Sequence, residues 1–118
     1  MIIAIPLEEN RESVCASFGR APYFMLHNNE TNTSEVKANP AASAEGGAGI
    51  KAAQFVLDAG AGVVITVRCG QNAADVFKTA GTKVYKALHT GANENLTALA
   101  EGKLEELTDF HPGFRGRA

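Results

Sequence analysis

Tryptophan is absent from the 118 residues, and aromatic side chains make up only 7% of them. The chain therefore lacks the aromatic surface on which single-stranded nucleic acids stack. Cysteine is also scarce, because only Cys15 and Cys69 occur and no CxxC pair is present. This spacing excludes zinc ribbons and knuckles and argues against a disulfide framework.

The sequence also lacks a strong charge of one sign and a long apolar run. Its formal net charge is −2, so no overall field attracts nucleic acid or an acidic membrane surface. No stretch approaches the roughly 18 apolar residues that a membrane span needs. The first residues, MIIAIPLEEN, lack the basic start and cleavage site of a signal peptide. We therefore expect a cytoplasmic protein that binds neither nucleic acid nor membranes.

Hydrophobic patterning predicts five strands and three helices. Apolar or alternating runs indicate strands at 2–7, 23–28, 33–38, 62–67 and 83–88, and helical periodicity indicates helices at 50–60, 71–81 and 92–102. The order β β β α β α β α predicts an α/β fold with a mixed sheet and helices on its faces. We expect one domain over residues 1–107 and a flexible tail over residues 108–118.

The predicted topology brings the unusual segments of the chain to one edge of the sheet. Open α/β sheets bind ligands beyond the carboxyl ends of their parallel strands. That edge should carry the loops 39–49, 68–72 and 88–92. The segment FGRAP (18–22) should reach the same edge, because the strand after it runs antiparallel.

The glycine-rich segment EGGAGIK (45–51) resembles a phosphate-binding loop but fails the nucleotide motifs. Lys51 follows isoleucine and precedes alanine, which excludes a Walker A loop. A dinucleotide fingerprint would need a shorter distance from the preceding strand and an acidic residue where Arg68 stands. What remains is a helix N-terminus whose free N–H groups favour an anion, or glycines that only permit a tight turn.

Three further side chains are candidates for this edge, each with a structural alternative. Arg20 offers five N–H donors to an anion, or it stabilises its own loop by bonding carbonyls. Cys69 follows a strand and precedes a helix, where we expect a lowered pKa and a soft thiolate ligand, although a buried, inert thiol is equally compatible. His89 is either a metal ligand or an ordinary surface histidine. Cys15 could share a metal or form a redox pair with Cys69.

Enzymatic activity is not expected. Two-metal nucleases need several carboxylates at strand ends, and only Glu8 and Glu9 follow the first strand, with no acidic partner after the fourth. A nucleophile elbow and a Ser-His-Asp arrangement are also lacking.

SFGRAPYFML, NPAASAEGGAGIKAAQ, ITVRCGQNAADVFKTAGTKVYKA and GKLEEL together resemble the nitrogenase iron–molybdenum cofactor biosynthesis family. That family includes NifX, the C-terminal part of NifB and the orange protein of sulfate reducers, which carries a molybdenum–copper–sulfide cluster. The resemblance covers residues 2–107 and implies a ribonuclease H-like fold. It also implies non-catalytic binding of metal–sulfur clusters or their precursors. Many relatives have Gly-Pro-Asn-Ala where this chain has Gly70-Gln71-Asn72-Ala73.

The residue patterns and the resemblance together predict an anionic metal–sulfur cluster, of iron–molybdenum or molybdenum–copper sulfide type, at the carboxyl edge of the sheet. Predicted cluster-binding residues are Arg20, Asn39, Gly46, Gly47, Gly49, Arg68, Gly70 and Asn72, and predicted metal ligands are Cys69 and His89. Expected partners are proteins that donate or accept the cluster. The alternative is a redox-responsive regulatory or interaction module that binds a partner or a small anion.

Overall fold

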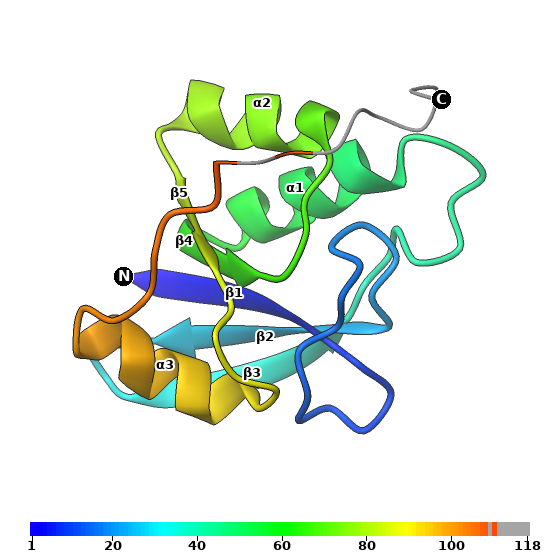
Figure 1. Ribbon diagram of the computed structural model, residues 1–118. Coiled ribbons are helices and arrows are strands. Elements are labelled where there is room, and N and C mark those ends of the chain that lie inside the picture. The colour runs from blue at the N-terminus through cyan, green and yellow to red at the C-terminus, as the bar shows by residue number, and fades with distance from the viewer. Residues whose placement is uncertain (109, 111–118) are drawn as a thin grey trace.

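The computed structural model describes residues 1–108 and 110, which form five strands and three helices (Figure 1). In chain order these are β1 (Ile2–Leu7), β2 (Tyr23–Asn28), β3 (Thr33–Ala38), α1 (Ala48–Asp58), β4 (Ala61–Thr66), α2 (Gln71–Ala80), β5 (Lys83–Lys86) and α3 (Ala92–Ala100). The predicted element order is confirmed.

A single mixed sheet organises these elements in the order β3-β2-β1-β4-β5. The pairs β1–β2 and β2–β3 are antiparallel, whereas β1–β4 and β4–β5 are parallel. Helices α1 and α2 lie side by side on one face of the sheet, and α3 lies on the other (Figure 1). This arrangement confirms the mixed α/β sheet with helices on both faces, in the strand order of a ribonuclease H-like fold.

The two faces of β1 explain why its sequence is apolar throughout. Ala4 faces the cluster under α1 and α2, whereas Ile3, Ile5 and Leu7 face the cluster under α3. A strand that is buried on both faces has no position for a polar side chain. Leu96 and Leu99 of α3 pack against the second cluster, and so does Leu104, which follows the helix.

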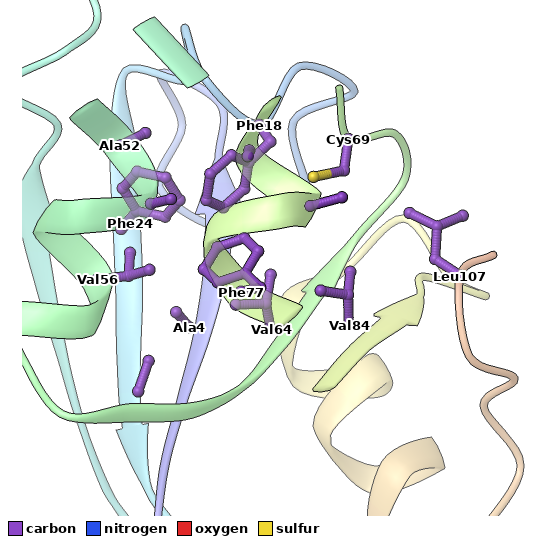
Figure 2. Packing of buried hydrophobic residues seen from close by; sticks show 14 of the residues in the cluster. Ala4, Phe18, Phe24, Ala52, Val56, Val64, Cys69, Phe77, Val84 and Leu107 are labelled. Atoms are coloured by element: carbon purple, nitrogen blue, oxygen red, sulfur yellow. The ribbon is translucent and has the colours of Figure 1, made fainter. Parts of the chain in front are cut away.

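Three phenylalanines form the centre of the larger cluster, which lies under α1 and α2 (Figure 2). The ring centroid of Phe18 lies 5.2 Å from that of Phe24 and 5.4 Å from that of Phe77, in tilted and edge-on arrangements. Because Phe18 lies in the loop before β2, burial of its ring fixes that loop to the helical layer.

Several element boundaries differ from the prediction by one or two residues, and two of these differences have a clear physical reason. Helix α1 begins at Ala48, before Ile50, because Gly47 adopts a left-handed conformation and its carbonyl accepts the N–H of Lys51. Strand β5 ends at Lys86, before the predicted position 88. There the N–H of Leu88 bonds the side chain of Asn95, so the backbone leaves the sheet.

Helix α2 begins at Gln71, as the sequence predicts. Its N-cap is Gly70, and Asn72 lies inside the first turn without a side-chain capping bond. Asparagine is a favoured N-cap residue, but Asn72 does not cap this helix.

None of the helices formed by residues 1–108 and 110 has the length and hydrophobicity that a membrane span requires. Most of the predicted C-terminal tail, including His111, lies outside the described residues. The flexibility of that tail stays a prediction.

Candidate functional site

A cleft of ≈ 570 Å³ opens where the chain connects β4 to α2. Three segments line it: residues 16–20 before β2, residues 45–50 at the start of α1, and residues of the 68–73 segment at the start of α2. The topology places these segments beyond the carboxyl ends of β1 and β4, as predicted. The loop 88–92, which we expected at the same site, contributes no lining residue.

The FGRAP loop lies directly on the first turn of α1. A Cβ atom added to Gly19 would stand 2.9 Å from the backbone nitrogen of Gly49 and 3.0 Å from its Cα. Real side chains do not approach backbone atoms so closely, so only glycine permits this contact. The close approach brings the 16–20 and 45–50 walls of the cleft together.

Asn39 fixes the same loop through hydrogen bonds to its backbone carbonyls. Its buried side-chain nitrogen donates to the carbonyls of Gly19 and Ala21, at 3.0 and 2.9 Å. Its side-chain oxygen accepts the N–H of Ala41 at 2.9 Å. Asn39 does not line the cleft, so the structure gives it a positioning role where the sequence prediction had placed it in contact with cargo.

Arg20 both lines the cleft and braces it. Its Nη1 donates to the carbonyl of Ala44 at 2.6 Å and to that of Ala42 at 3.3 Å. These bonds tie the FGRAP loop to the segment that leads into α1. The two alternatives considered for Arg20 are therefore compatible, because the side chain bonds carbonyls and still borders the cleft.

Two helices begin in the cleft with unpaired backbone donors. Within the described chain, the N–H groups of Ala48, Gly49 and Ile50 bond no backbone carbonyl, and the same holds for residues 71–73. The two helix starts are adjacent, since a Cβ on Gly49 would lie 3.6 Å from the Cβ of Ala73. Both helix dipoles therefore direct their positive ends, and their free donors, to one space.

The charged side chains of the cleft reinforce this potential. Arg20 and Arg68 line it with Glu45, so cationic groups outnumber anionic ones. Among residues 1–108 and 110, neither arginine forms an ion pair with a carboxylate. Of the predicted cluster-binding residues, Arg20, Gly46, Gly47, Gly49, Arg68, Gly70 and Asn72 all border the cleft.

Cys69 does not reach the cleft. It is 1% exposed and belongs to the hydrophobic cluster under α1 and α2, and its sulfur points into that cluster (Figure 2). Burial raises the pKa of the Cys69 thiol to about 11, so the expected lowering of its pKa is wrong. The strand brings the backbone to the edge of the sheet, but the side chain turns inward.

His89 and Cys15 also lie outside the cleft lining. His89 is exposed, and its backbone N–H donates to Asn95 Oδ1 at 3.0 Å. Cys15 is buried and unpaired, and burial together with the nearby Glu8 raises its pKa, against a lowering contribution from the Ser17 backbone. In the described part of the chain no group of three or more His, Cys, Asp or Glu side chains could hold a metal ion.

Asn95 is a buried polar residue that the sequence prediction missed. Its side chain bonds Leu88 and His89 through their N–H groups and His89 and Gly91 through their carbonyls, at 2.7–3.0 Å. The sequence signal for its burial is its place beside Leu96 in a predicted helix whose leucines, Leu96 and Leu99, face inward. A buried amide there needs partners, and the adjoining loop supplies them.

The family model described as "Dinitrogenase iron-molybdenum cofactor" matches residues 1–102. The chain belongs to this family. The resemblance seen in the sequence is thereby confirmed. No curated protein sequence matches the chain.

Several solved structures are similar to this dinitrogenase cofactor family member over nearly the whole length of its chain. The apo orange protein from Desulfovibrio gigas is 29% identical, with a TM-score of 0.83 over 91% of this chain and 92% of that one. A Thermotoga protein provisionally assigned as NifB is 36% identical, with a TM-score of 0.77 over 92% and 95%. A Methanocaldococcus jannaschii protein provisionally assigned as a dinitrogenase shares the fold, at 15% identity and a TM-score of 0.65 over 92% and 96%.

Gly19→Ala should destabilise this family member by about 1–3 kcal/mol, because the added methyl group forces the FGRAP loop away from α1. Gly46→Ala is the matched control. A Cβ at Gly46 meets no atom within 4 Å, so its free energy of unfolding should change by less than about 0.5 kcal/mol. Urea unfolding of both variants measures the difference, and equal stabilities would contradict the close approach.

The buried Cys69 thiol should make stability depend on pH in the alkaline range. Its pKa rises from the ordinary value of 9.0 to about 11 in the folded protein, so the folded state holds this proton more tightly. The stabilisation is complete below pH 9 and is lost as pH rises toward about 11. Cys69→Ala should flatten the fall in the free energy of unfolding over this window relative to the parent protein. An unchanged slope would contradict the burial of the thiol.

Proposed function

We propose that this protein binds an anionic metal–sulfur cluster, or its precursor, in the cleft between the FGRAP loop and the starts of α1 and α2. The observation that carries the proposal is the convergence of two helix N-termini and two arginines on one space. Membership of the dinitrogenase iron–molybdenum cofactor family supports a metal–sulfur species over other anions.

The donors of the cleft suit such a cargo. Backbone N–H groups of residues 48–50 and 71–73 would donate hydrogen bonds to sulfido or oxo groups, and the guanidinium groups of Arg20 and Arg68 would balance the charge. Phe18, Ala48, Ile50 and Ala73 add apolar surface to the same walls. Removing water from around the cargo strengthens every charge interaction with it.

The absence of Cys and His side chains from the cleft lining favours carriage over catalysis. All lining residues lie within the described chain, and none of them is a thiol or an imidazole. A cluster held by hydrogen bonds and charge can leave without breaking a metal–protein bond. We therefore propose a non-catalytic carrier that receives its cluster from one protein and delivers it to another.

Arg68→Ala should weaken cargo binding by about ten- to a hundredfold, the worth of one charge-assisted contact. Arg68 is the cleaner test, because Arg20 also braces its loop. The probe is tetrathiomolybdate, with and without Cu(I), titrated under anaerobic conditions and followed by its visible absorption. Arg11→Ala is the matched control, since Arg11 stacks on Tyr23 outside the cleft and should leave the affinity unchanged.

Binding should also weaken as ionic strength rises, because the contacts are electrostatic. Loss of binding in Cys69→Ser with full binding in Arg68→Ala would overturn the proposed site in favour of thiolate ligation. Failure of the wild-type protein to bind any thiometallate, together with ready formation of a Cys15–Cys69 disulfide, would favour the redox-responsive module. Both cysteines are free in this structure.

A further inference from the structure

The two edges of the sheet differ in how they are protected. At the β5 edge, the backbone of residues 105–107 pairs with the strand. Lys86 donates its N–H to Glu105, Leu107 donates to Val84, and Tyr85 bridges Glu106. An ion pair between Lys83 and Glu106, at 3.5 Å, closes the same edge.

The β3 edge is open. All six residues of β3 are exposed, and outside the β2–β3 ladder none of them takes part in a backbone hydrogen bond within the described chain. The pairing with β2 is regular from Thr33 to Ala38, without a bulge, and the strand contains no proline. A regular edge without a bulge or a proline is a template for another strand, unless its charged side chains oppose the pairing.

We propose that β3 pairs antiparallel with β3 of a second copy of this chain, about a two-fold axis at Val36. In this register Glu35 lies opposite the partner's Lys37, and Lys37 lies opposite the partner's Glu35. Ser34 lies opposite the partner's Ala38. Each copy thus places a positive charge opposite a negative charge of its partner, and the two-fold axis repeats the same contact on both sides.

The charges select this register over the two neighbouring two-fold registers. In an antiparallel pair, the two residues that lie opposite each other have their side chains on the same face of the sheet. The two-fold axis must therefore pass midway between the two copies of one residue. An axis at Glu35 would place two carboxylates opposite each other, and an axis at Lys37 would do the same with two ammonium groups. Like charges directly opposite are destabilising, whereas opposite charges stabilise the pair.

The side chains also suit this register on both faces. Lys37 Nζ lies 3.6 Å from Glu35 Oε1 within one strand, so the two charges share a face and need little movement to meet the partner's charges. On the other face Val36, a 41% exposed apolar residue, would meet the partner's Val36 and lose contact with water.

This dimer leaves the cleft accessible. Strand β3 runs parallel to β1, whose carboxyl end borders the cleft region. An antiparallel pair of β3 strands therefore sends the two clefts to opposite ends of one continuous sheet. The assembly presents two independent cargo sites and does not depend on the function proposed for them.

Sedimentation velocity of the full chain, from micromolar to near-millimolar concentration, tests the interface. The wild-type protein should show a dimer fraction that rises with concentration. Glu35→Lys and Lys37→Glu should each raise the dimer dissociation constant by about tenfold or more, because each makes every charge across the axis alike. Circular dichroism should show unchanged folds, since both side chains are exposed.

An equimolar mixture of the two single variants provides the decisive control. Opposite charges then face each other at every position of a mixed dimer, so association should return, and the double variant Glu35→Lys/Lys37→Glu should dimerise with itself. A wild-type protein that stays monomeric throughout would overturn the proposal. A dimer that ignores both single reversals would equally overturn it.

Discussion

The contact between Gly19 and the first turn of α1 is the constraint on which the rest of the site depends. It lets the FGRAP loop lie against helix backbone, at a distance that no side chain would tolerate. Phe18 anchors the loop by packing against Phe77 in the core, and Asn39 anchors it by a hydrogen bond to the carbonyl of Gly19. Arg20 can then reach the carbonyls of the segment before α1. Together these contacts create a cleft whose walls come from three distant parts of the chain.

The chemistry of this cleft follows from backbone geometry more than from reactive side chains. N–H groups at two adjacent helix starts, which have no backbone partner among residues 1–108 and 110, create a positive region that two guanidinium groups strengthen. The two thiols, which would be the natural ligands for a soft metal, are buried, and their pKa values are raised. Such a site would select a guest by charge and hydrogen bonding, as the proposed carrier role requires.

Much of the fold could be predicted from the sequence because the decisive patterns are local. The apolar runs of β1 and β4 and the helical periods of α1 to α3 fix the element order, and the topology brings the rim loops together. The direction of individual side chains could not be predicted. Cys69 follows a strand, but packing among phenylalanines turns it inward, and Asn95 organises a loop through bonds that only the tertiary fold creates.

The central claim is that an anion binds between the starts of α1 and α2. Backbone amide chemical shifts during an anaerobic titration with tetrathiomolybdate test this most directly, because they locate the guest without altering the protein. We predict that the largest shifts occur at residues 46–50 and 70–73, with little change around His89. Shifts centred on His89, or on the loop 8–14, with the helix starts unaffected, would contradict the account.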